Sequence, residues 1–281
     1  MAIVYAPSEK GFDPRLEAID RCQITLLRDL SHQLGNRLVL KGGMAMRVAF
    51  GSMRLTKDID FDRDQRIGQD TLVRNLDRML IRAAGLARIQ NPNAQITKNT
   101  STTVRARIEG TIENDTDVRF DVEVSGRSPP SGKSVRSEVV VPPAKYAMAP
   151  FPVVTYTNPA LAVMKIGAAL SEQRNAPRDL YDLRDLIWAH TDPTELLAQQ
   201  DTDLLEDFIT RAPAKLELLS FELAQQELLP YLPPESRHAL DEANWLDATI
   251  MVSQTIQHWC RAALAQQRGP ARPLPSAVRR P

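Results

Sequence analysis

The chain has few cysteines and no long apolar stretch, and each shortage excludes a class of protein. Only two of its 281 residues are cysteine, too few for the disulfide framework of a small secreted domain. Both, Cys22 and Cys260, fall in helical patterns, where cysteine is typically a small buried hydrophobic residue. No apolar run approaches the roughly 18 residues of a transmembrane helix, and residues 1–13 lack the layout of a signal peptide. We therefore expect a cytoplasmic protein without membrane contact.

The chain also lacks net charge, because 35 Lys and Arg balance 35 Asp and Glu. This balance excludes a uniformly basic nucleic-acid coat, although not a local patch. The charge is in fact segregated: residues 37–107 hold 14 basic against 6 acidic side chains, and residues 178–207 hold 2 against 9. Residues 261–281 add five arginines and no acid. The basic segments favour a phosphate-rich partner, with solvated surface charge as the alternative.

Apolar periodicity predicts an α+β half followed by an all-helical half. In the first half, helices are expected over 14–34, 44–50 and 70–84, and strands over 37–41, 55–62, 103–109, 117–125, 135–141 and 152–156. In the second half, helices are expected over 158–172, 177–188, 195–209, 213–228, 234–243 and 246–266. The predicted organisation is an α+β domain over 1–155, a helical domain over 156–267, and a disordered Arg- and Pro-rich tail over 268–281.

Two carboxylates, Asp58 and Asp60, stand two residues apart in an expected strand. Residues i and i+2 of a strand share a face, so both carboxylates project together while Ile59 and Phe61 enter the core. Such a pair repels itself unless a cation lies between, and Mg²⁺, or Mn²⁺ in its place, is commonly bound by one or two carboxylates plus substrate phosphates. The alternative is an exposed strand face whose acids pair with neighbouring cations.

Two glycines, Gly42 and Gly43, join an expected strand to a short helix. Glycine lets backbone N–H groups approach a phosphate closely, and the start of a helix adds partial positive charge. An ordinary tight turn is the alternative. The position of these glycines shortly before the carboxylate pair favours a phosphate-binding turn beside a metal site.

If two metal ions are used, a third carboxylate ligand is expected on the strand over 117–125, where Asp121 and Glu123 share one face. We favour Asp121 because it lies nearer the middle of the strand, and a half-solvated strand face is the alternative. Arg105 and Arg107 share a face of the preceding strand and are expected to lie along a nucleic-acid backbone.

Four motifs then resemble a known family. They are K-G-G-x-A-x-R at 41–47, R-x-T-x-D-I-D-F at 54–61, Met164–Leu170, and R-D-x-x-D-L at 178–183. In this order they resemble the nucleotidyltransferase toxins of the AbiEii/AbiGii group, within the DNA polymerase β-like superfamily. The resemblance implies that superfamily's mixed sheet with helices. Met44 departs from the pattern, since the family usually has Ser or Thr there.

The resemblance also implies roles for individual residues. It assigns catalysis to Asp58, Asp60, Asp121, Lys165 and Asp182, with the first three also binding metal. It assigns nucleotide binding to Gly42, Gly43, Met44, Arg54, Lys165 and Arg178, with Asp179 organising the site. From the residues alone, Lys165 is also consistent with a lysine that extends to the surface, and the acids near 180 with surface ion pairs.

The implied activity is metal-dependent transfer of a nucleotide from an NTP to an RNA such as the 3′ end of tRNA. The protein would act as a toxin of a toxin–antitoxin system, with a cognate antitoxin as partner and the nucleotide bound between the two halves. Two alternatives remain: transfer to a small molecule, as in antibiotic-modifying relatives, and a catalytically silent binding or regulatory protein. A glycosyltransferase D-x-D would not explain Gly42, Gly43 or Lys165.

Overall fold

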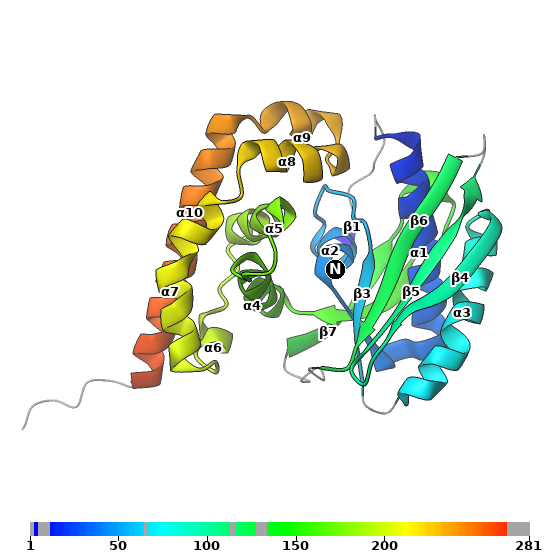
Figure 1. Cartoon of the computed structure of the whole chain (residues 1–281), viewed down its shortest axis with the longest axis horizontal. Helices are drawn as coiled ribbons and strands as arrows, with labels where there is room; N and C mark the ends of the chain where they lie inside the picture. The colour runs from blue at the N-terminus through cyan, green and yellow to red at the C-terminus, as the bar shows by residue number, and fades with distance from the viewer. Residues whose placement is uncertain (1–2, 5–11, 65–66, 113–115, 128–133, 269–281) are drawn as a thin grey trace, which may run out of the picture.

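A computed structural model describes all residues except 1–2, 5–11, 65–66, 113–115, 128–133 and 269–281 (Figure 1). Its centre is an eight-stranded mixed sheet with the strand order β1-β7-β8-β2-β3-β6-β5-β4. The strands are β1 (Ile3–Val4), β2 (Leu38–Lys41), β3 (Ile59–Arg63), β4 (Gln90–Asn99), β5 (Thr103–Ile112), β6 (Thr116–Ser125), β7 (Val135–Val141) and β8 (Phe151–Tyr156). Strand β3 runs parallel to β6 and antiparallel to β2, which places the two expected acidic strands side by side.

Three α-helices belong to the described part of the sheet half: α1 (Pro14–Leu34), α2 (Gly42–Ala45) and α3 (Gln69–Leu86). Figure 1 shows α1 and α3 packed along one side of the sheet, with the helical half on the other side of the molecule. Helix α1 begins as the sequence predicts, because the Asp13 carboxylate accepts a hydrogen bond of 2.7 Å from the Arg15 amide. Its apolar side chains, including Leu26 and Leu30, are buried against the sheet.

The C-terminal half is helical, as predicted. Its helices are α4 (Asn158–Ala169), α5 (Pro177–Trp188), α6 (Thr194–Leu197), α7 (Thr202–Glu217), α8 (Phe221–Glu227), α9 (Pro234–Ala239) and α10 (Glu242–Arg268). Helix α4 contributes to two apolar cores: Leu161 packs with the sheet half and Ile166 with the other helices. The two cores therefore meet within α4. In the part of the chain that the structure describes, no helix is long and apolar enough to cross a membrane.

Several element boundaries differ from the sequence prediction. Strand β4 is not predicted, because it is a polar edge strand that contains Pro92 and buries little apolar surface. Strand β3 begins only at Ile59, since residues before it form a loop whose Leu55 amide bonds to the carbonyl of Tyr231 at 2.8 Å. Pro213 lies inside α7 instead of starting a helix. The predicted tail lies outside the described residues, apart from Arg268 at the end of α10.

Both cysteines are buried and unbonded, as the sequence predicts. Burial raises the pKa of the Cys260 thiol to about 11, so the thiol is protonated at neutral pH. Neither cysteine is thus a candidate nucleophile.

A buried ion pair joins α1 to the segment that follows α2. The Arg47 guanidinium donates to the Asp20 carboxylate at 2.7 and 3.0 Å, and the Tyr146 hydroxyl donates to the same carboxylate at 2.7 Å. Arg47 and Asp20 are both fully buried. The arginine of the first sequence motif therefore has a structural role, holding the glycine turn against α1.

We expect Asp20→Ala to lower the free energy of unfolding by about 3–5 kcal/mol, because it leaves the buried Arg47 charge uncompensated. Urea denaturation measures this loss. Glu17→Ala is the matched control on the same helix, since Glu17 pairs with Lys145 at 2.7 Å in a partly exposed position. The control should lose less than about 1 kcal/mol, and an equal loss in both variants would contradict the structural role of Arg47.

Candidate active site

A cleft of about 410 Å³ lies between the sheet and the helices α4 and α5. Six cationic side chains and four carboxylates contribute to its walls in the described part of the chain. The cations are Lys41, Arg54, Arg105, Lys165, Arg174 and Arg178, and the carboxylates are Asp58, Asp60, Glu123 and Asp179. Both halves of the chain thus supply the walls of one charged cavity.

The glycine turn forms one end of the cleft, and the neighbouring atoms leave no room for a side chain at either glycine. Gly42 follows β2 with a φ of 67°, a conformation that other residues rarely adopt. A Cβ atom on Gly42 would lie 2.5 Å from Oδ2 of Asp60, and one on Gly43 would lie 2.5 Å from Oγ1 of Thr56 and 3.0 Å from the Arg54 guanidinium. The turn therefore lies directly against Asp60 of the carboxylate pair and against Arg54. Helix α2 begins at the first of these two glycines.

The carboxylates of Asp58 and Asp60 repel one another in a partly buried position. Burial first, and then the charge of Asp58, raises the pKa of Asp60 to about 6. Burial also raises the pKa of Asp58, although the Asp121 amide opposes this by donating a hydrogen bond of 3.2 Å. Two oxygen ligands under mutual repulsion fit a hard divalent cation such as Mg²⁺, which would neutralise them.

The third predicted ligand, Asp121, lies beside Asp58 but does not line the cleft. Its carboxylate accepts two hydrogen bonds from Arg107, at 2.7 and 3.1 Å, and lines a neighbouring pocket with Asp58. Glu123, the less favoured choice from the sequence, is paired in register with Asp60 and lines the cleft, where it binds Arg105. Among the described residues, no group of three or more His, Cys, Asp or Glu is arranged to hold a metal ion.

A network of buried charges connects the two halves behind the cleft. The Arg54 guanidinium donates two hydrogen bonds of 2.6 Å to Asp182, and the Lys165 ammonium lies 2.5 Å from Asp182 and 2.8 Å from Asp179. Burial disfavours the charged forms of Arg54 and Asp182, but their ion pairing outweighs this effect of burial. Asp182 raises the pKa of Arg54, and Arg54 and Lys165 lower the pKa of Asp182. Lys165 is only 7% exposed, so the alternative that it extends to the surface is wrong.

Arg178 differs from the other cations of the cleft. It lies in the first turn of α5, is partly buried and lines the cleft, and its charge opposes the rise that burial causes in the pKa of Asp58, yet within the described residues no hydrogen bond or ion pair is found for it. The other five cations each bond to a carboxylate, Arg174 for example to Asp179 at 2.5 Å. Arg178 therefore has its full hydrogen-bonding capacity available for an anion.

Two predicted residues occupy places that restrict their roles. Met44 is completely buried and does not line the cleft, so only its backbone could face a nucleotide. Asp182 is also completely buried and is not among the lining residues, so it could act only through Arg54 and Lys165, as a positioning residue. Sequence reasoning missed Arg174, for which no motif provides a signal, and gave no role to Lys41, although that residue stands inside the first motif.

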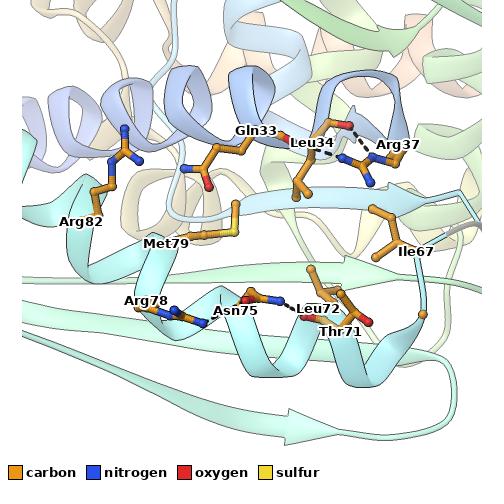
Figure 2. Close-up of a pocket in the computed structure, with 11 residues that line it drawn as sticks. Gln33, Leu34, Arg37, Ile67, Thr71, Leu72, Asn75, Arg78, Met79 and Arg82 are labelled. Carbon is orange, nitrogen blue, oxygen red and sulfur yellow. Dashed lines mark hydrogen bonds between the residues drawn. The ribbon is translucent and has the colours of Figure 1, made fainter.

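A second cavity, of about 480 Å³, lies between α1 and α3 (Figure 2). The described residues that line it include Arg37, Arg78 and Arg82 but no carboxylate. It therefore offers no carboxylate to a divalent cation, and the cleft beside Asp58 and Asp60 is the candidate active site.

Comparison with known proteins identifies the family of the chain. A family model described as "Nucleotidyl transferase AbiEii toxin, Type IV TA system" matches residues 25–267. The chain belongs to this family. The match spans both the sheet half and the helical half, and so includes the whole cleft. A search of curated proteins found no match.

Solved structures share the fold of this AbiEii family member. JHP933 from Helicobacter pylori is 18% identical, with a TM-score of 0.58 over 92% of this chain and 98% of that one. A putative nucleotidyltransferase from H. pylori is also 18% identical, with a TM-score of 0.52 over 89% and 98% of the two chains. At this level of identity the similarity shows the arrangement of sheet and helices and does not establish a substrate.

Gly42→Ala should disorder the Asp60 carboxylate, because the new Cβ would overlap with Oδ2. Gly35→Ala is the matched control, since Gly35 also has a positive φ of 53° but has nothing within 4 Å of the added Cβ. We expect both variants to lose stability from backbone strain. Only Gly42→Ala should in addition lose binding of Mn²⁺ measured by calorimetry, and an equal loss of Mn²⁺ binding in Gly35→Ala would contradict the contact.

Proposed function

We propose that this AbiEii family member is a metal-dependent nucleotidyltransferase that adds a nucleotide from an NTP to the 3′ end of an RNA, such as tRNA. The observation that carries the proposal is the convergence of Asp58, Asp60, the glycine turn and Arg178 in one cleft. A carboxylate pair suited to Mg²⁺ beside an unpaired cation is the arrangement that a nucleoside triphosphate requires.

In this proposal each part of the cleft has a task. Asp58 and Asp60 would hold Mg²⁺ (or Mn²⁺), which when bound neutralises charge on the triphosphate and lowers the pKa of the acceptor hydroxyl. The amides at Gly42 and Gly43 and the guanidinium of Arg178 would bind the β- and γ-phosphates. Lys165, held in place by Asp179 and Asp182, would place a further positive charge at the cleft wall.

The reaction replaces one P–O bond by another and releases one proton. The acceptor hydroxyl loses its proton to solvent, its oxygen bonds to the α-phosphorus, and the bond from that phosphorus to the β-phosphate oxygen breaks. Pyrophosphate leaves with the electron pair. Catalysis depends on positioning and on fixed positive charge, which the paired and therefore rigid Arg54 and Lys165 supply without reorganisation.

RNA is the favoured acceptor because the strands beside the cleft carry a row of arginines, Arg105, Arg107 and Arg119. Phosphate contacts dominate nucleic-acid affinity. Membership of a toxin–antitoxin family favours an antitoxin protein as a further partner. A small-molecule acceptor is the second candidate, and the salt dependence of acceptor binding separates the two, since only RNA binding should weaken steeply as salt rises.

Asp60→Asn should have opposite effects on stability and on activity. Without divalent metal, removing a charge that burial and Asp58 disfavour should raise the melting temperature by about 2–4 °C, as expected for about 1 kcal/mol. Transfer of labelled nucleotide to total tRNA with Mg²⁺ should fall by about 100-fold or more. If the variant keeps wild-type transfer, Asp60 does not bind the catalytic metal.

Arg178→Ala should weaken triphosphate binding by about 10-fold or more, because a hydrogen bond between charged groups contributes about 1.5–3 kcal/mol. The rise in melting temperature on adding NTP with Mg²⁺ reports binding. Arg78→Ala, an exposed arginine of the α1–α3 cavity in Figure 2, is the control and should keep the full rise. A full rise in Arg178→Ala as well would remove Arg178 from the nucleotide site.

A further inference from the structure

A pocket of about 230 Å³ lies beside the cleft, at the start of β3. Its walls come from the first turns of α1, from β5 and β6, and from the 3₁₀ turn Leu229–Tyr231 of the helical half. Figure 1 shows α8 and α9, which flank this turn, extending over the loop that precedes β3. The fold thus builds a second, smaller cavity from both halves.

Asp58 and Thr56 line both the cleft and this pocket. In nucleotidyl transfer the attacking and leaving oxygens lie roughly in line on opposite sides of the phosphorus. The acceptor must therefore approach the metal-binding carboxylate from the side opposite the pyrophosphate. We propose, resting on the function proposed above, that this pocket receives the 3′-terminal nucleoside of the RNA acceptor and directs its hydroxyl to Asp58.

The size and lining of the pocket fit one nucleoside. Its volume lies below the 300–1,000 Å³ typical of drug-sized ligand sites, whereas the cleft falls within that range. Ile19 and Phe120 form a buried apolar floor, and Tyr231 contributes a partly exposed ring. An apolar floor and an aromatic ring bind a base of any sequence by stacking.

Tyr231 is held in place by the loop that carries the catalytic motif. Its carbonyl accepts a hydrogen bond of 2.8 Å from the Leu55 amide, and the Lys57 ammonium lies 5.3 Å from the centre of its ring. Burial raises the pKa of Tyr231, the Arg178 charge opposes this rise, and the Asp58 charge adds to it. Because the anchor is a backbone bond, the ring can be changed without releasing the turn.

Cations at the pocket are suited to the phosphates that precede the terminal nucleoside. Arg107 is fixed by its two hydrogen bonds to Asp121, which explains why Asp121 faces this pocket and not the cleft. The Arg119 side chain is 56% exposed and 3.4 Å from Glu109, so it can turn towards a phosphate. Arg107 and Arg119 line the pocket itself, and a phosphate that precedes the terminal nucleoside is present in a polymer and absent from a small acceptor without one.

The test is binding of a short single-stranded RNA that ends in a 3′-deoxynucleotide, measured by fluorescence anisotropy without catalysis. Tyr231→Ala should weaken binding by about 10-fold or more, whereas Tyr231→Phe, which keeps the ring, should bind like the wild type. Both variants should keep the wild-type rise in melting temperature with NTP and Mg²⁺. Arg119→Gln should reduce the slope of log affinity against log salt by about 0.7, and the exposed α3 control Arg74→Gln should not.

The outcomes distinguish failure of the pocket assignment from failure of the proposed function. Wild-type RNA affinity in Tyr231→Ala, an equal loss in Tyr231→Phe, or an unchanged slope in Arg119→Gln would overturn the pocket assignment. Failure of the wild type to bind the RNA would also overturn it and favour a small acceptor. If the binding effects appear but no nucleotide is transferred to an RNA with a free 3′ hydroxyl, the proposed function fails while the pocket assignment stands.

Discussion

The candidate site depends on one set of buried ion pairs across the boundary between the two halves. Arg54 comes from the loop before β3, whereas Asp182 and Lys165 come from α5 and α4. Removing one partner from such a set leaves a buried charge whose desolvation is not compensated. The buried charges are therefore compensated only when the two halves are packed together, and the same packing forms the walls of the cleft.

The segregated charge of the sequence finds its explanation in this interface. The basic first half provides Arg54, and the acidic segment 178–207 provides Asp179, Asp182 and Asp185. The hydroxyl of Ser52 also donates to Asp185 at 3.3 Å. Some of the basic residues that suggest a nucleic-acid partner in the sequence are therefore used in ion pairs inside the protein. Among the cleft cations in the part of the chain that the structure describes, Arg178 in the first turn of α5 is the one without such a carboxylate partner.

The glycine turn and the carboxylate pair show how closely the local geometry is constrained. Gly42 leaves room for the Asp60 carboxylate, and Gly43 leaves room for Thr56 and Arg54. The first motif thus makes space for the second, although 15 residues or so separate them in the sequence. Two other residues of the first motif, Met44 and Arg47, are buried, and Arg47 bonds to Asp20 of α1 on the side of the turn away from the cleft.

The sequence by itself determined the α+β and helical halves, the paired carboxylates and the glycine turn, because periodicity and motif spacing are local properties of the chain. It could not reveal β4, whose polar residues lie at the sheet edge, or the helix through Pro213, which packing on α10 maintains. Only the tertiary structure separates Asp121 from Glu123 in space, since both share one strand face. Their separation into two pockets follows from which arginine of β5, Arg107 or Arg105, lies opposite each in the register.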